Sequence, residues 1–257
     1  MDDPRYFRQA LDSMLQQTVP ADEFILVCDG PLTPELDSVI QEYQNDLTVV
    51  RLAENRGLGV ALNIGMEHCT NDLVARMDSD DISVPDRCEK ELRAFEQDDR
   101  LAIVSSTIEE FYDITDETTK KRWLPGEHDE IVLFSKRRCP FNHPVVMYRK
   151  SAVIAAGGYR EEYHRFEDYD LWVRMLDSGA IGRNLSDVLL RMRVSDALYM
   201  RRGGKEYAGE LLRFHNHLRK TGWISTFVFV TCAVPHAMVC VMPNAIRKAV
   251  YKLLRKS

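Results

Sequence analysis

Arg76-Met77-Asp78-Ser79-Asp80-Asp81 is the most informative stretch of this chain for its fold. It follows the apolar residues 73–75, which the pattern predicts as a buried strand, and Pro85 beyond it suits the first turn of a helix. Three carboxylates therefore stand where a strand ends, the edge at which open α/β sheets bind ligands. Such close carboxylates repel one another unless a cation lies among them, and hard divalent cations prefer carboxylate oxygens. The residues alone leave open a solvated acidic loop or an N-cap cluster facing a helix dipole.

Strands and helices alternate on both sides of this stretch. Apolar periodicity and turn residues predict helices at 5–17, 34–43, 60–69 and 85–97, and strands at 24–28, 47–52, 73–77 and 101–105. The short connections favour a parallel, doubly wound sheet. Such a unit normally begins with a strand, whereas this chain begins on a helix. Either the first strand is missing from the sequence, or the strand order differs.

After residue 106 the pattern is less regular. We expect a helix around 128–136, a strand at 144–148 and a short helix that ends at Gly157. A further helix begins near Asp168, a residue that can be read either as a helix cap or as a functional carboxylate.

The composition is that of an ordinary globular protein, but the charge is unevenly spread. The 257 residues are 45 % hydrophobic and 29 % charged, with a net charge of −6. After residue 200, eleven Lys and Arg face two Glu, a local charge of +9 that leaves −15 for the first 200 residues. An acidic body with a basic tail indicates that the tail meets an anionic surface, and no nucleic-acid partner is expected.

The six cysteines form no CxxC pair and suit free thiols in a reducing compartment. No signal peptide is expected, because the first residues are acidic and no apolar run follows them.

An uncharged apolar segment follows a predicted polar helix at 205–220. Residues 223–242 contain no Asp, Glu, Lys or Arg, and as one helix they have the length of a bilayer core. Basic residues flank both ends without the bias of a one-way crossing, and Pro235 lies in the middle. The pattern favours two shorter helices, bent at Pro235, on the membrane surface over a spanning helix or a buried one.

A series of short motifs resembles the family 2 glycosyltransferases of GT-A fold. The motifs are Asp29-Gly30, Glu54-Asn55-Arg56-Gly57-Leu58-Gly59, Ala75 to Asp81, Pro85-Asp86-Arg87, Asn142-His143-Pro144, Gly157-Gly158-Tyr159 and Glu167-Asp168-Tyr169-Asp170-Leu171-Trp172. The resemblance covers roughly residues 5–200 and is closest to the bacterial branch that builds exopolysaccharide, capsule or O-antigen, the amylovoran-biosynthesis type. It implies a Rossmann-like α/β domain over residues 1–200, with a mostly parallel sheet flanked by helices. Residues 201–257 would be a basic, membrane-associating helical tail. The first strand of the family, which helps to hold the nucleotide, is absent from the sequence.

The resemblance implies a nucleoside-diphosphate sugar as donor. Asp29 would bind the base and Asp78 the ribose. Asp80, with Asp78, would hold Mg²⁺ or Mn²⁺ against the diphosphate, whose growing negative charge needs a fixed cation. Arg56 and Arg76 could neutralise phosphate or form structural ion pairs.

By the same resemblance, Asp168 is the general base that deprotonates the acceptor hydroxyl, with Glu167 beside it. Inversion by direct displacement needs one base and no enzyme nucleophile. His143 could contact the metal or the acceptor, or could be a structural histidine.

The implied acceptor is a saccharide or a lipid-linked saccharide, met at the cytoplasmic face of the plasma membrane by a peripheral or monotopic enzyme of surface polysaccharide synthesis. Two other functions stay open. One is a sugar nucleotidyltransferase, and the other is an inactive, membrane-bound remnant of the same fold without its first strand.

Overall fold

The structure is a computed structural model that describes residues 3–112, 119–195, 203–243 and 247. The chain divides into two compact units. The first comprises residues 1–134 and 139–193, and the second comprises residues 135–138 and 194–257. Each is described by itself.

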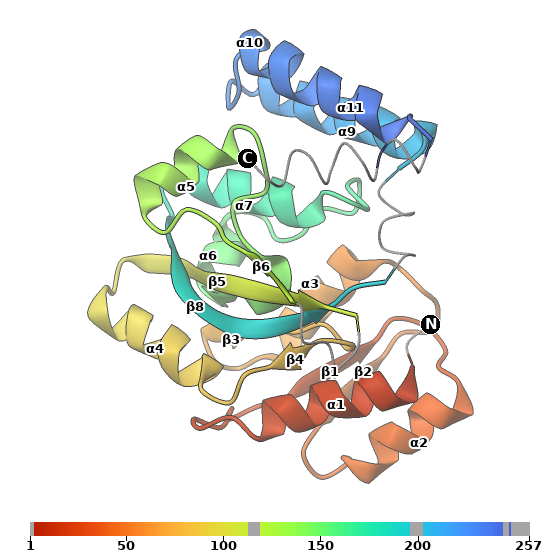
Figure 1. Ribbon diagram of the computed structural model, residues 1–257. Coiled ribbons are helices and arrows are strands. Elements are labelled where there is room, and N and C mark those ends of the chain that lie inside the picture. The colour runs from red at the N-terminus through yellow and green to blue at the C-terminus, as the bar shows by residue number, and fades with distance from the viewer. Residues whose placement is uncertain (1–2, 113–118, 196–202, 244–246, 248–257) are drawn as a thin grey trace. The chain divides into compact units, whose positions relative to one another are not determined.

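Helices and strands alternate through the first half of the chain, as the sequence predicts (Figure 1). In order they are α1 (Pro4–Leu15), β1 (Ile25–Cys28), α2 (Pro34–Glu42), β2 (Thr48–Arg51), α3 (Leu58–His68), β3 (Leu73–Ala75), β4 (Ile82–Ser83), α4 (Arg87–Gln97) and β5 (Leu101–Phe111). The chain continues with β6 (Lys120–Arg122), α5 (His128–Ser135), the 3₁₀ turn η1 (His143–Val145), β7 (Met147–Arg149), α6 (Lys150–Ala155), α7 (Glu167–Asp177) and β8 (Ile181–Arg193). The predicted α/β class is confirmed.

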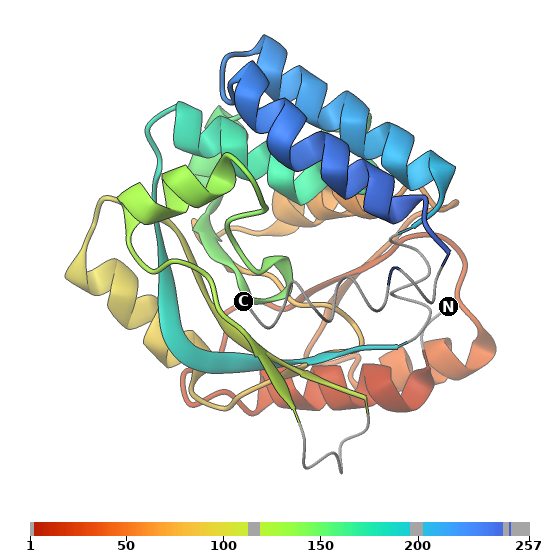
Figure 2. The same cartoon turned by 45° about the horizontal axis from the view of Figure 1, so that its top comes forward.

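The strands form two sheets. β1 and β2 pair in parallel, and the other six strands follow the order β3-β7-β5-β8-β4 with β6 beside β5. The long strands β5 and β8 pair in parallel and curve together (Figure 2). β3 runs in the same direction as β5, since both are antiparallel to β7 between them. The short strands β4 and β6 are also antiparallel to their neighbours.

The long strands thus run in parallel as predicted, but the structure differs from the predicted doubly wound sheet at two points. The chain doubles back through β7, which enters between β3 and β5 and makes both contacts antiparallel. Among the described residues, no strand supplies the hydrogen bonds that would join β1 to β3, so β1 and β2 stand as a sheet of their own.

Two apolar clusters fix the strands that carry the polar motifs. One joins α1 and α2 to the end of β1, through Phe7, Leu11, Cys28 and the α2 residues Leu36, Val39 and Ile40. The other joins α4, β5 and β7 through Ala94, Phe95, Leu101, Val104 and Met147. Burial of these side chains drives the packing of helix on strand, at about 1.5–3 kcal/mol for each large side chain.

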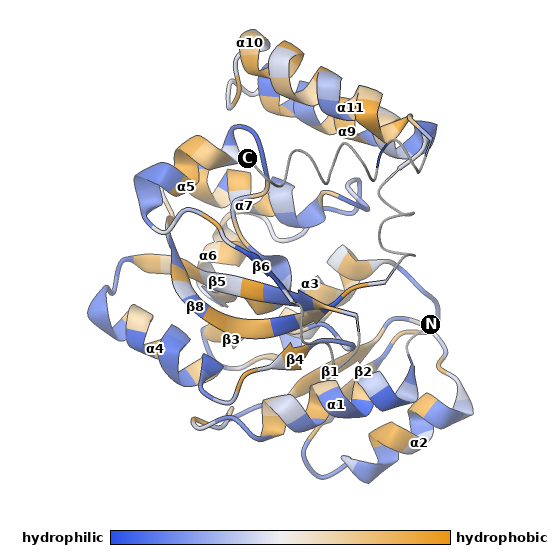
Figure 3. Ribbon diagram, viewed as in Figure 1, coloured by the Kyte–Doolittle hydropathy of each residue, from blue (hydrophilic) through white to orange (hydrophobic). Residues whose placement is uncertain are grey.

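The second unit contains α9 (Lys205–Lys220), α10 (Thr226–Val228), the π-helical turn η2 (Phe229–Ala233) and α11 (Val234–Cys240). α9 is the predicted polar helix, and Figure 3 shows α11 as markedly more apolar. The irregular turn η2 directly precedes Pro235, whose ring cannot pack against the carbonyl of Thr231 four residues earlier, so the helix widens before the proline. None of the helices in the described part of the chain combines the length and apolarity that a bilayer crossing needs.

Candidate active site

The loop after β3 begins with a buried ion pair. The Arg76 backbone N–H donates to the Val146 carbonyl at 2.9 Å, which aligns the start of the loop with β7. The Arg76 guanidinium is buried and donates to both oxygens of Asp78, with Nη1 at 3.0 Å from Oδ2. Charge-assisted pairs of this kind are strong and directional. Of the two interpretations of Arg76, the structure shows the ion pair.

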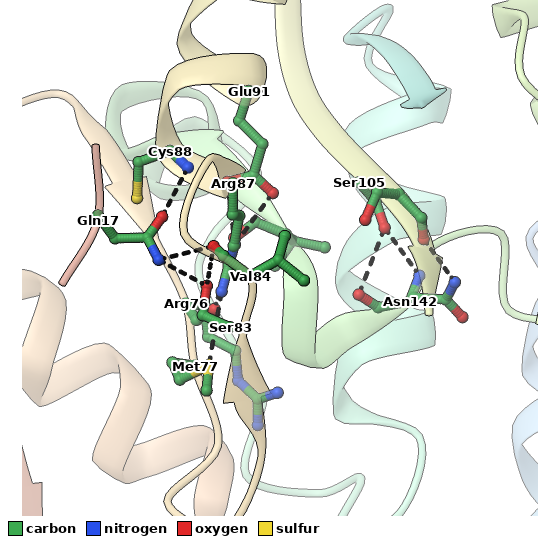
Figure 4. A network of polar contacts seen from close by, with 12 residues as sticks. Gln17, Arg76, Met77, Ser83, Val84, Arg87, Cys88, Glu91, Ser105 and Asn142 are labelled. Carbon is green, nitrogen blue, oxygen red and sulfur yellow. Dashed lines mark hydrogen bonds and ion pairs between the residues drawn. The ribbon is translucent and has the colours of Figure 1, made fainter. Parts of the chain in front are cut away.

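A second arginine supports the backbone of this loop (Figure 4). Arg87, at the start of α4, is fully buried, and its Nη2 donates to the Arg76 carbonyl at 2.7 Å and to the Val146 carbonyl at 3.3 Å. Its Nε faces Glu91 at 3.1 Å, and burial raises the pKa of Glu91 to about 7 against the opposing effect of Arg87. Arg87 therefore fixes the backbone that carries Asp78. The sequence motif marks this residue but not these partners.

Gln17, after α1, ties the same region to the first helix (Figure 4). Its Nε2 donates to Ser83 Oγ at 3.2 Å and to the Val84 carbonyl at 2.8 Å, while its Oε1 accepts from the Cys88 N–H at 3.0 Å. One amide thus satisfies groups on both sides of the turn between β4 and α4.

The acidic cluster continues with a buried carboxylate. Asp81 Oδ1 accepts from the Arg193 backbone N–H at 2.8 Å, and Oδ2 is buried without a hydrogen-bond partner within the described residues. Burial, and next the charges of Asp78 and Asp80, raise the pKa of Asp81 to about 8. Arg193 Nε also donates to the Asp80 carbonyl at 3.0 Å. Arg193 was not among the predicted site residues, since it lies at the far end of β8.

The cluster fits a divalent cation in its chemistry. No group of three or more His, Cys, Asp or Glu in the described ranges is arranged to hold a metal ion. Mg²⁺, however, often uses only one or two carboxylates and takes its other ligands from substrate phosphates and water. Besides its burial, the charges of Asp78 and Asp80 raise the pKa of Asp81, so three carboxyl groups lie close together here. Asp78 and Asp80 could therefore hold an ion together with a bound diphosphate.

Asp29, at the end of β1, organises the neighbouring loop. Its Oδ1 accepts from the Arg56 N–H at 2.7 Å and its Oδ2 from the Gly57 N–H at 2.9 Å. Gly30 has φ +100°, and a Cβ there would lie 2.9 Å from the Asn55 nitrogen, so only glycine fits. The Arg56 side chain is about half exposed, 3.5 Å from Glu161. The predicted contact of Asp29 with a base would therefore use the remaining lone pairs of its carboxylate.

Glu167 and Asp168 form the first turn of α7, and the structure brings Glu167 near the acidic loop. Glu167 is buried, and its Oε2 has no hydrogen-bond partner among the described residues. Burial, and next Asp168, raise the pKa of Glu167 to about 7, and Arg76 and Asp78 also act on it. Glu167 lines a cavity of about 90 Å³ beside the start of α3. Segments almost ninety residues apart in sequence thus share one electrostatic environment.

Asp168 is the second residue of α7, not its N-cap, which is Phe166. Its Oδ1 accepts from the Tyr169 N–H at 2.7 Å, and Cys139 Sγ lies 3.5 Å from its Oδ2. The capping interpretation is therefore wrong.

His143 lies in an aromatic cluster. Its Nε2 is 3.0 Å from Tyr159 Oη, and its ring centroid is 5.9 Å from that of Trp172. Burial, and next the charge of Arg76, hold the pKa of His143 well below its ordinary value, so the imidazole is neutral. Asn63 of α3 anchors the same Tyr159 through its backbone, with Oδ1 and Nδ2 at 2.9 and 2.7 Å from the Tyr159 nitrogen and oxygen. The structure places His143 as a packed residue of this aromatic cluster.

The chain as a whole is similar to several known proteins. A family model described as "Glycosyl transferase family 2" matches residues 3–156. An Escherichia coli protein named UDP-Gal:alpha-D-GlcNAc-diphosphoundecaprenol beta-1,3-galactosyltransferase is 37 % identical over 254 residues, covering 98 % of this chain and 91 % of the relative. The amylovoran biosynthesis glycosyltransferase AmsE of Erwinia amylovora is 38 % identical over 259 residues, covering 98 % and 95 %.

Among solved structures, the mannosyltransferase PcManGT from Pyrobaculum calidifontis, in complex with GDP-Man and Mn²⁺, superposes with a TM-score of 0.65 at 16 % identity. The match covers 100 % of this chain and 78 % of that one. At this identity the likeness concerns the fold alone.

Proposed function

This chain belongs to the family 2 glycosyltransferases, and from that membership we propose that it is a metal-dependent, inverting enzyme of surface polysaccharide synthesis. It would transfer a sugar from a nucleoside diphosphate to a lipid-linked saccharide. The observation that carries the proposal is that Arg76 and Asp78 of the acidic loop act electrostatically on the buried Glu167 carboxyl in the first turn of α7. The acidic loop after β3 suits the donor diphosphate, and the first turn of α7 suits the acceptor hydroxyl.

The donor side rests on the loop after β3. Asp78 and Asp80 would hold Mg²⁺ or Mn²⁺ together with the diphosphate oxygens, and the ion would stabilise the charge of the leaving diphosphate. Arg76 orients the Asp78 carboxylate by donating to both of its oxygens. Asp29 holds the backbone of the loop at Arg56 and Gly57, against which the base and ribose would lie. A solved neighbour that shares the fold is named for its complex with GDP-Man and Mn²⁺, which supports a nucleotide-sugar donor used with a divalent cation.

The acceptor side rests on α7. Asp168 would take the proton of the attacking hydroxyl, and the hydrogen bond from the Tyr169 N–H to its Oδ1 orients the carboxylate for that role. Burial raises the pKa of Glu167 to about 7, so it carries less negative charge near neutral pH than an ordinary carboxylate. A single base without an enzyme nucleophile gives direct displacement with inversion.

The second unit offers a surface for the membrane where such an acceptor resides. Its exposed apolar side chains are Phe227, Val230, Met238 and Val241, with Phe227 74 % exposed. No Asp, Glu, Lys or Arg occurs between residues 221 and 246, whereas the flanks are basic. An apolar helix face with basic flanks suits peripheral attachment to an anionic cytoplasmic leaflet. The relative named for a diphosphoundecaprenol acceptor supports this location.

The donor site is tested by thermal unfolding with UDP, GDP or dTDP, each with and without Mn²⁺. A ligand at a hundred times its dissociation constant stabilises a protein by about 2.7 kcal/mol, which gives a measurable rise in Tm. We expect a Mn²⁺-dependent rise with one nucleotide that Asp80→Asn abolishes and that Asp99→Asn, the same change at an exposed surface position, retains. No rise with any nucleotide would favour the inactive remnant. Release of pyrophosphate from an NTP and a sugar phosphate would favour the nucleotidyltransferase.

Membrane attachment is tested separately by flotation with vesicles of anionic or neutral lipid. Phe227→Asp should abolish binding to anionic vesicles. Gly209→Asp adds the same charge at an exposed α9 position where a side chain meets nothing within 4 Å, and should bind normally. Equal binding of both variants would exclude the α10–α11 surface.

A further inference from the structure

A thiol lies against the proposed base. Cys139 Sγ is 3.5 Å from Asp168 Oδ2 and also 3.5 Å from the Phe141 carbonyl oxygen. Burial, and next the Asp168 charge, raise the pKa of the Cys139 thiol well above its ordinary value, so it keeps its proton and can donate it. With the Tyr169 N–H on Oδ1, both oxygens of the Asp168 carboxylate have a donor.

The segment that carries this thiol is fixed by the sheet. The Asn142 backbone N–H donates to Ser105 Oγ at 3.1 Å, and its Nδ2 donates to the Ser106 carbonyl at 2.7 Å (Figure 4). Asn184 of β8 donates to the Pro140 carbonyl at 3.1 Å. Both neighbouring strands β5 and β8 therefore hold the backbone on either side of Phe141.

The same segment is locked to the helix of the base. The Phe141 ring packs edge-on against Trp172 of α7, with centroids 5.8 Å apart. Trp172 lies one helical turn after Asp168, so this contact sets the distance between Cys139 and the Asp168 carboxylate. Gly182 gives the ring its space, because a Cβ there would lie 2.5 Å from the Phe141 Cζ. The position of the thiol is thus built by three separate elements.

We propose that Cys139 is a positioning residue for the general base: its S–H donates to Asp168 Oδ2 and holds the carboxylate in one rotamer, facing the acceptor hydroxyl. The inference rests on the proposed role of Asp168 as base. A hydrogen bond to the ionised carboxylate also favours that form, so the base stays deprotonated at lower pH. A thiol is a weak donor and is shared here with the Phe141 carbonyl, so the effect is modest and graded.

The test compares Cys139→Ala and Cys139→Ser by the pH profile of kcat/KM for transfer to the acceptor. Alanine removes the donor, and the acidic limb of the profile should move up by about 0.5 pH unit while kcat falls about three- to tenfold. Serine is a stronger donor, so Cys139→Ser should keep kcat and move the acidic limb below the wild-type position. Neither change should alter KM for the donor, because the nucleotide site is separate.

Cys69→Ala is the matched control, since Cys69 is another partly buried thiol that donates to a carbonyl, that of Gly65 at 3.4 Å. It should leave the pH profile unchanged. Wild-type pH profiles for both Cys139 variants would overturn the inference, and the serine variant, which is close in size to cysteine, decides this even if the alanine variant folds poorly.

Asp168→Asn distinguishes failure of the base assignment from failure of the proposed role of Cys139. If it retains turnover, the base assignment itself fails and the inference fails with it. If it loses turnover but the Cys139 profiles stay at the wild-type position, only the role of Cys139 is refuted. Adding Cys139→Ala to Asp168→Asn should cause no further loss, since a positioning residue acts only through its partner.

Discussion

Gly182→Ala should damage both stability and transfer, although Gly182 contacts no substrate group. The new Cβ would lie 2.5 Å from Phe141 Cζ and 3.0 Å from Cε1. Because an ordinary contact begins at 3.4 Å, the ring must move by about 0.9 Å. It has little room to do so, since Phe141 is only 3 % exposed and packs on Trp172.

The cost follows from these contacts. Overpacking a close-packed core costs about 1–3 kcal/mol. Displacing an aromatic pair from its preferred edge-on geometry adds about 0.5–1.5 kcal/mol. We therefore expect Gly182→Ala to lower the free energy of unfolding by about 2–4 kcal/mol. We also expect a fall in kcat, because the Phe141 segment carries Cys139 against Asp168.

Urea unfolding and initial-rate kinetics measure these two effects. Phe141→Leu in the Gly182→Ala background should recover part of the lost stability, since the smaller side chain makes room for the methyl group. Gly209→Ala is the control, because its Cβ meets nothing within 4 Å and alanine favours the α9 helix by about 1 kcal/mol. A Gly182→Ala protein within about 0.5 kcal/mol of the wild type would refute the reasoning.

Three further changes test the site. Arg87→Met should lower stability by about 3 kcal/mol in urea unfolding, because the buried carbonyls of Arg76 and Val146 lose a donor; an unchanged midpoint would contradict that support. Glu167 has a folded pKa of about 7 against an ordinary 4.5, so metal-free stability should fall by up to about 3 kcal/mol as pH rises from 4.5 to 7. Glu167→Gln should flatten that fall and be the more stable protein at pH 8, and parallel pH curves would count against a buried Glu167. Asp29→Ala leaves two backbone N–H groups without their acceptor, so it should weaken nucleotide binding in the thermal assay more than Asp29→Asn does. If both variants bind the nucleotide equally well, this loop does not hold the nucleotide.

The local pattern predicted most elements because each depends on neighbours in sequence. Apolar runs with polar ends marked β1, β2, β3 and β5, and the residues directly after the strands included Asp29 and Asp78. Strand ends at one edge of a sheet are where ligands bind, so these residues became candidates without any coordinates. The helix predicted at 205–220 agrees with the bounds of α9 in the structure.

Side-chain partners could not be read in the same way. The sequence left Arg76 open as a phosphate ligand or, more often for such a residue, a structural ion pair, and only the structure shows its bonds to Asp78. His143 carries no local sign of the aromatic cluster that keeps it neutral. Arg193 meets Asp81 across 112 positions of sequence, and no spacing rule reaches that far.

Local sequence was enough to predict the alternation of strands and helices, the family, and the carboxylates at strand and helix ends. These depend on periodicity and on ordered short motifs. Three features became visible only in the folded chain: β7 enters between β3 and β5, β1 and β2 form a separate sheet, and Cys139 faces Asp168. Those outcomes depend on hydrogen bonds and packing between distant segments, whose free energies are set only once the whole core has closed.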